Sequence, residues 1–270
     1  MNRGAFDTSD VVAAEVAQRL AGRHVLLLTD FDGTLADLVP MPGDAVMSDE
    51  VRACLDAVAR VESITVGVVS GRRLADVRAR VGPDAEYVAG LHGLEILGPS
   101  DVFVHPSLQA VAPIVQELAH VAAKQLGQYP GVFIEDKTFA LTCHVRQASA
   151  EDAARALDAF EVMAEPEVER GTLRLLPGAQ VCELVPAVDW HKGRAAEWIR
   201  EHVAARLGAR VPVIFLGDDR TDEDAFAALG ADDFAIGVGP RPHSHLIEWR
   251  LAGPASVGRF FARLGGAKST

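Results

Sequence analysis

The apolar segment at residues 24–29, His-Val-Leu-Leu-Leu-Thr, is the feature that most constrains the fold of this chain. A continuous apolar run of this length is typical of a strand covered on both faces, and such strands occur mainly in parallel sheets. The run ends at two carboxylates, Asp30 and Asp32. Because an unpaired buried carboxylate is costly, this placement indicates a cation or a hydrogen-bond network at the end of the strand.

Strand-like and helical segments alternate along much of the chain. Further buried strand-like runs occur at 64–69, 85–90, 211–217 and 234–239, and segments with helical spacing lie between them. This alternation predicts an α/β fold, namely a doubly wound, Rossmann-like parallel sheet with helices on both faces.

The pattern changes between residues 99 and 183. Two long helical segments and two long strand-like segments occur there, at 107–127, 149–163, 131–145 and 172–186. The polar alternation of the strand-like segments fits an antiparallel sheet with helices on one face. We therefore predict that 99–183 form an inserted α+β domain, and that 1–98 and 184–270 together form the parallel-sheet core.

Composition excludes several classes of function. The net charge of -12 disfavours nucleic acid and anionic membranes as partners, and no apolar run is long enough to span a bilayer. The N-terminal residues lack the apolar region of a secretory signal. Three cysteines without metal-site spacing, Cys54, Cys143 and Cys182, favour reduced thiols. We expect a cytoplasmic monomer that acts on a small molecule.

Three predicted strands end in polar residues that suit one site, at 30–34, 70–72 and 217–219. Ligands of an open parallel sheet bind beyond the carboxyl ends of its strands, so we expect these segments to meet. Carboxylates gathered there require a cation, and hard oxygen ligands suit Mg²⁺. A calcium loop is excluded because Leu35 and Met41 occupy positions that need Gly and Glu. The pair His243 and His245 could ligate a metal, but its Pro-flanked segment favours an ordinary loop.

Four segments resemble the motifs of the haloacid dehalogenase superfamily of phosphotransferases: DFDGTL from Asp30, SGR from Ser70, HKG around Lys192 and GDDRTDEDAF from Gly217. More narrowly, AGLHGLEI, EDK with HVR, and CELVP with DWHKG resemble segments of the trehalose-6-phosphate phosphatase family. The resemblance covers about residues 24–257. Leu91 and Thr138 depart from it, because the family usually has a small polar residue and a glycine at these positions. It implies that the inserted domain is a substrate-selecting cap.

The resemblance also implies a reaction, the Mg²⁺-dependent hydrolysis of trehalose 6-phosphate to trehalose and phosphate through an aspartyl phosphate. Asp30 would be the nucleophile and Asp32 the general acid and base. The Asp30 carboxylate, the Asp32 main-chain carbonyl and Asp218 would hold Mg²⁺. Ser70 and Lys192 would bind phosphoryl oxygens, and Asp219 and Asp222 would orient Lys192 and the ligands. Substrate contacts would come from Gly33, Thr34, Gly71, Arg72, His92, Glu135, Lys137, Arg146 and Glu183.

Several alternatives stay open at this point. Lys192 could be an exposed first-turn lysine, and the charged residues of the inserted domain could form an exposed polar sheet face. Another sugar phosphate, of the sucrose or glucosylglycerol type, could be the substrate, and a phosphomutase would keep the same nucleophile. A non-catalytic sugar-phosphate-binding regulatory protein would be expected to lack one of the four central residues, yet all are present, namely Asp30, Asp32, Lys192 and Asp218.

Overall fold

The computed structural model describes residues 8–178, 180–240 and 245–266, and the chain divides into two compact units. Met1–Phe103 and Trp190–Thr270 form the first, which we call the core unit, and Val104–Asp189 form the second, the inserted unit. His243 lies outside the described residues, so the interpretation of its pair with His245 stays a prediction.

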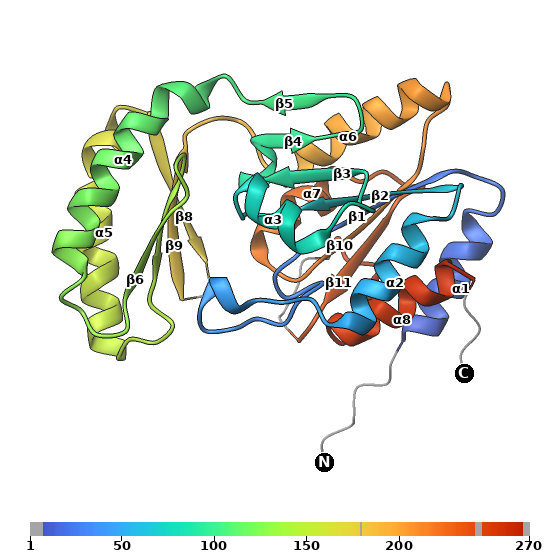
Figure 1. Ribbon diagram of the computed structural model, residues 1–270, viewed down its shortest axis with the longest axis horizontal. Coiled ribbons are helices and arrows are strands. Elements are labelled where there is room, and N and C mark those ends of the chain that lie inside the picture. Colours follow the sequence, from blue (N-terminus) through green and yellow to red (C-terminus); the bar gives the residue numbers. More distant parts are fainter. Residues whose placement is uncertain (1–7, 179, 241–244, 267–270) are drawn as a thin grey trace, which may run out of the picture. The chain divides into compact units, whose positions relative to one another are not determined.

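An eight-stranded sheet forms the centre of the core unit, with strand order β12-β11-β10-β1-β2-β3-β4-β5 (Figure 1). Neighbouring pairs from β12 to β3 are parallel, whereas β4 runs antiparallel to β3. The strands are β1 Val25–Thr29, β2 Ile64–Val69, β3 Tyr87–Gly90, β4 Glu95–Leu97, β5 Val102–Val104, β10 Val213–Gly217, β11 Phe234–Val238 and β12 Trp249–Leu251. The predicted doubly wound α/β core is confirmed.

Helices cover both faces of this sheet, because alternate side chains of a strand point to opposite faces. Leu27 of β1 packs in one apolar cluster with α1, α2, α3 and α8, whereas Leu26 and Leu28 pack in another with α6 and α7. The helices are α1 Ser9–Arg19, α2 Asp49–Ala59, α3 Leu74–Val81, α6 Lys192–Leu207, α7 Glu223–Ala227 and α8 Pro254–Leu264. The short 3-10 segments are η1 Pro42–Asp44, η2 Leu91–Gly93 and η3 Arg220–Asp222. Because the helices pack closely on both faces of the sheet, the strand ends, and the loops that begin there, are held in fixed positions.

The inserted unit is a four-stranded antiparallel sheet of order β6-β7-β9-β8, and α4 and α5 pack against it and against each other (Figure 1). Its elements are α4 Ser107–Leu126, β6 Phe133–Asp136, β7 Leu141–His144, α5 Ala150–Glu169, β8 Leu173–Gly178 and β9 Val181–Pro186. The register places Glu135, Thr142 and Glu183 opposite one another across three strands. One face of the sheet therefore carries a row of polar residues.

The unit boundaries lie a few residues later than the predicted positions 99 and 183. β5 follows residue 99 but belongs to the core sheet, and β9 continues to Pro186 within the inserted sheet. Helix α5 extends beyond its predicted end at 163 and contains Pro166. Ala156, Phe160 and Ala164 form the buried face of α5, and this packing continues to within two residues of the proline. None of the described helices is both long and apolar enough to cross a bilayer.

Candidate active site

The loops after β1, β2 and β10 meet at one edge of the core sheet, because the three strands are adjacent and parallel. Asp30 follows β1, Ser70 follows β2 and Asp218 follows β10. Lys192, the first residue of α6, joins them from a distant part of the chain: its Nζ lies 2.7 Å from Oδ1 of Asp30. The structure thus brings together the four segments that the sequence singled out.

Lys192 is buried at the centre of this arrangement, with 2% of its surface exposed. Its ammonium group donates to Oδ1 of Asp30 and to Oδ1 of Asp222, each at 2.7 Å. A buried ammonium group needs such partners, because burial removes its hydration. The alternative of an exposed first-turn lysine is therefore wrong.

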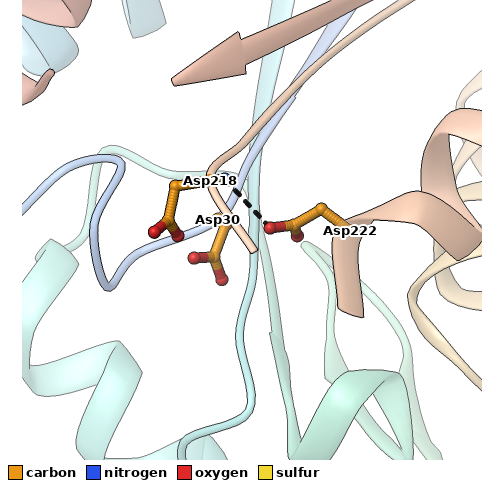
Figure 2. Close-up of side chains that lie close together, drawn as sticks. All are labelled: Asp30, Asp218 and Asp222. Carbon is orange, nitrogen blue, oxygen red and sulfur yellow. Dashed lines mark hydrogen bonds between the residues drawn. The ribbon is translucent and has the colours of Figure 1, made fainter. Parts of the chain in front are cut away.

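Asp30, Asp218 and Asp222 form a buried group, in which one carboxylate oxygen of each lies within 4.8 Å of the others (Figure 2). Oδ2 of Asp222 accepts hydrogen bonds from the backbone N–H of Asp218 at 3.1 Å and of Asp219 at 3.0 Å. Asp222 therefore orients both Lys192 and the loop that carries Asp218. Three carboxylates beside one ammonium group leave excess negative charge, and this oxygen set could hold Mg²⁺.

The electrostatic environment of Asp30 also favours a cation beside its carboxylate. Burial raises the pKa of its carboxyl group well above the ordinary value, and Lys192 opposes this shift. The neighbouring carboxylates, Asp222 foremost, raise the pKa further. For Lys192, burial alone would lower the pKa, but the charges of Asp222 and Asp30 raise it. Lys192 is thus held in its charged form, whereas an ionised Asp30 needs a further positive charge beside it.

Two glycines allow the loops to approach this closely. Gly33 has a φ of 82°, and a Cβ atom at this position would lie 2.2 Å from Oδ2 of Asp218. A Cβ atom at Gly217 would lie 2.3 Å from the carboxyl carbon of Asp222. Any other residue at either position would displace a carboxylate of the buried group.

Asp32 is not a member of that carboxylate group. Its Oδ2 accepts from Nε of Arg72 at 2.7 Å, and its Oδ1 accepts from Nη2 at 2.6 Å. Asp32 is half-buried, and Arg72 is buried with 6% of its surface exposed. The two aspartates of the opening motif therefore face different cations, Lys192 and Arg72.

The remaining predicted contacts of the core unit surround these groups. Oγ of Ser70 accepts from the backbone N–H of Arg72 at 3.2 Å. The His92 ring packs so closely on Gly71 that a Cβ atom there would lie 2.7 Å from Cε1. Thr34 is fully buried, and its hydroxyl has no hydrogen-bond partner among the described residues. Ser70, Gly71 and His92 thus form one packed corner beside the strand ends.

The inserted unit holds a second polar cluster, on the sheet face that carries Glu135, Thr142 and Glu183. Nζ of Lys137 donates to Oε1 of Glu183 at 2.7 Å, and both residues are 7% exposed. Oε2 of Glu135 lies 2.8 Å from Nε2 of His144. The alternative of an exposed polar face is therefore wrong for Lys137 and Glu183. Arg146 lies two residues beyond the end of β7 and is half-buried.

Comparison with known proteins identifies the family. The family model for trehalose-phosphatase matches residues 28–245. The chain belongs to the trehalose-phosphatase family. It is 36% identical over 247 residues to the trehalose-phosphate phosphatase of Mycobacterium ulcerans, an alignment that covers 89% of this chain and 61% of that protein. The chain thus spans about three fifths of the length of this relative.

One solved structure agrees with this family assignment, and a second agrees with the fold. The trehalose-6-phosphate phosphatase of Aspergillus fumigatus is 29% identical, with a TM-score of 0.61, and the match covers 95% of this chain and 98% of that one. The C-terminal domain of the Candida albicans trehalose-6-phosphate phosphatase has a TM-score of 0.77 at 22% identity, with 95% and 98% covered. The second likeness supports the fold alone.

Two residues of this trehalose-phosphatase family member had no role assigned from the sequence, although His144 begins the quoted HVR segment. His144 pairs with Glu135, and the Thr142 hydroxyl lies 3.4 Å from Oε1 of Glu183. Strand alternation could have found them, because 142 and 144 fall on the same face of β7. Burial alone would raise the pKa of Glu135, but the hydrogen bond with His144 and the charge of Lys137 lower it.

Proposed function

We propose that this chain is a Mg²⁺-dependent phosphatase that hydrolyses trehalose 6-phosphate to trehalose and phosphate. The observation that carries the proposal is the environment of Asp30, a buried carboxylate at the end of β1 that pairs with Lys192 and lies beside Asp218 and Asp222. Such a group is a plausible nucleophile only if positive charge compensates it. Membership of the trehalose-phosphatase family supports the assignment.

In the proposed reaction, a carboxylate oxygen of Asp30 attacks phosphorus, and the bond from phosphorus to the sugar oxygen breaks. Asp32 donates a proton to the leaving sugar oxygen. A water molecule then attacks the phosphorus of the aspartyl phosphate, returns a proton to Asp32 and releases phosphate from Asp30. Lys192 and the Ser70 hydroxyl bind phosphoryl oxygens, whose charge shifts during both steps.

The donor set fits a magnesium ion. The carboxylates of Asp30 and Asp218 and the main-chain carbonyl of Asp32 are the proposed ligands, and the spacing of the buried group keeps Asp222 within reach. When bound, the ion would neutralise the carboxylates and the charge on the phosphoryl oxygens. Gly33, Thr34 and Gly71 are proposed to line the phosphoryl group.

We assign recognition of the sugar to Glu135, Lys137, Arg146 and Glu183 of the inserted unit and to His92. Acidic and basic side chains together suit a sugar, because each hydroxyl group both donates and accepts hydrogen bonds. A sucrose-type or glucosylglycerol-type phosphate remains the alternative substrate, because these side chains do not define the stereochemistry of the sugar. We further propose a cytoplasmic location, which the three free cysteines favour, and a monomeric state.

The test is phosphate release from a panel of sugar phosphates, each with and without Mg²⁺. The panel contains trehalose 6-phosphate, sucrose 6-phosphate, glucosylglycerol phosphate, glucose 6-phosphate and p-nitrophenyl phosphate. Mg²⁺-dependent release with the highest kcat/KM for trehalose 6-phosphate is the expected result. If another sugar phosphate gives the highest kcat/KM, that compound takes the place of trehalose 6-phosphate as the proposed substrate. Tight binding without turnover would favour a regulatory protein.

A further inference from the structure

Arg72 is held in place by four hydrogen bonds to residues of the core unit. Besides the two bonds to Asp32, Nη1 donates to Oδ2 of Asp76 at 2.8 Å, and Nη2 donates to the carbonyl of Pro42 at 2.8 Å. Its guanidinium carbon also lies 5.4 Å from the centre of the Phe31 ring. Within the described part of the chain, these contacts use four of the five N–H donors of the guanidinium group.

A second arginine supports the first. Oδ1 of Asp76 accepts from Nε of Arg80 at 2.9 Å, so Asp76 in α3 is shared by two guanidinium groups. Arg80 also donates to the carbonyls of Gly43 and Ala45, in and beside η1. A row of alternating charges therefore runs from Asp32 through Arg72 and Asp76 to Arg80. These contacts join the segment around η1 to α3. They also hold Arg72 on the side of its guanidinium group that contacts Asp76.

We infer that Arg72 is a positioning residue for Asp32 and not a contact of the substrate phosphate. A bidentate guanidinium group fixes both the position and the plane of a carboxylate, which a single ammonium group cannot do. The sequence placed Arg72 among the substrate contacts; in the structure its donors are directed to Asp32, Asp76 and a backbone carbonyl. The inference rests on the proposed function, in which Asp32 serves the leaving sugar oxygen.

This role predicts an effect that depends on the leaving group. A sugar alkoxide is a poor leaving group and needs a proton from Asp32, whereas p-nitrophenolate leaves without one. The kcat/KM value reports steps up to cleavage of the first bond, so it isolates this proton transfer from the later hydrolysis. A residue that contacts the phosphate would act on both substrates alike, because both carry the same phosphoryl group.

The experiment compares Arg72→Ala with the wild type on trehalose 6-phosphate and on p-nitrophenyl phosphate. We expect kcat/KM for the sugar phosphate to fall by about 100-fold, the scale of lost general acid catalysis, and that for p-nitrophenyl phosphate to stay within about threefold. In an Asp32→Asn background, Arg72→Ala should change neither value by more than about threefold. Arg73→Ala, at the neighbouring exposed arginine, is the matched control.

Three results would overturn the inference. These are an equal loss on both substrates, no loss on either, or a full additional loss in the Asp32→Asn background. If Arg72→Ala fails to fold, as judged by its thermal melt, Arg72→Lys and Asp76→Asn take its place. Both should show the same selectivity for the sugar phosphate with a smaller loss, and an equal loss on both substrates would again overturn the inference. Absence of wild-type turnover on the whole panel would instead reject the proposed function.

Discussion

The core unit and the inserted unit each contain a buried lysine that donates to a carboxylate at 2.7 Å, but they build the pair differently. Lys192 meets Asp30 where loops and a helix start converge at the edge of a parallel sheet. Lys137 meets Glu183 on the face of an antiparallel sheet. Converging loops concentrate charge around one point, which suits a single reacting atom. A sheet face spreads polar groups over several strands, which suits a ligand with many hydroxyl groups.

The largest expected effect concerns the core alone. Asp30→Asn should lower turnover on every substrate by about 10⁴-fold or more, because an amide cannot attack phosphorus. Its thermal melt should stay close to that of the wild type, since the amide fills the same space. Single-turnover phosphate release measures the first quantity. A folded variant that retains a tenth of wild-type turnover would move the nucleophile elsewhere.

The two buried lysines provide the most direct contrast between the units. Lys192→Met should lower turnover on both trehalose 6-phosphate and p-nitrophenyl phosphate by about 10²- to 10³-fold. Lys137→Met should lower kcat/KM for the sugar phosphate only. Each change leaves a buried carboxylate with one cation fewer and should lower the free energy of unfolding by about 3 kcal/mol, measured with urea. Equal losses of p-nitrophenyl phosphate turnover in the two variants would remove the functional distinction.

Metal binding should also be confined to the core. Mg²⁺ at 100 times its Kd should raise the free energy of unfolding of the wild type by about 2.7 kcal/mol. Asp218→Asn removes one proposed ligand and should abolish most of this gain, while Lys137→Met should keep it. Thermal melts with and without the ion give the comparison without any activity assay. An unchanged gain in Asp218→Asn would contradict the assigned ligand set.

The proposed sugar contacts of the inserted unit should affect only substrates that carry a sugar. Glu135→Ala should lower kcat/KM for trehalose 6-phosphate by an amount that corresponds to about 1–3 kcal/mol of lost transition-state stabilisation. The kcat/KM value for p-nitrophenyl phosphate should stay unchanged, because that ester has no sugar. Glu151→Ala, at an exposed glutamate of α5, is the control. If both substrates lose activity together, Glu135 serves the fold of the protein and not the sugar.

The smallest effect is a pH dependence of stability. The pKa of Glu135 is lowered in the folded state, so its stabilising contribution is present above the ordinary glutamate pKa. That contribution is lost as the pH falls through the lower, folded value. The melting temperature of Glu135→Gln should therefore lie below that of the wild type at neutral pH and converge with it in acid. A constant difference at all pH values would show that the charge of Glu135 plays no part.

Much of the core site could be predicted from the sequence. The run before Asp30 indicates a buried strand, and motif order places Asp30, Ser70 and Asp218 at strand ends of one sheet. The resemblance implies that Asp222 orients Lys192 and the ligands, but it does not give the approach of Asp222 to within 4.8 Å of Asp30 and Asp218, which depends on the turn of η3 behind Gly217. The pair of Asp32 and Arg72 joins residues 40 apart in sequence, and such long-range pairing leaves no local pattern.

The inserted unit was less predictable for a related reason. The face shared by Glu135, Lys137 and Glu183 follows from strand alternation, but their burial depends on packing that the pattern does not describe. Two departures from the family pattern prove informative. Leu91 and Thr138 both adopt a positive φ, of 50° and 70°, which is unfavourable for residues other than glycine. Comparison with the family pattern marks these two positions as unusual, but it does not give their backbone conformation.

The central claim is that chemistry occurs on Asp30, and trapping the phosphorylated protein tests it most directly. Trehalose 6-phosphate and Mg²⁺ are mixed with the wild type, the reaction is quenched in acid during turnover, and peptides are analysed by mass spectrometry. Acid preserves the aspartyl phosphate, and Asp30→Asn is the matched control. We predict one phosphoryl group on the peptide that contains Asp30 and none in the variant. A phosphoryl group on any other residue of a protein that turns over would contradict the account.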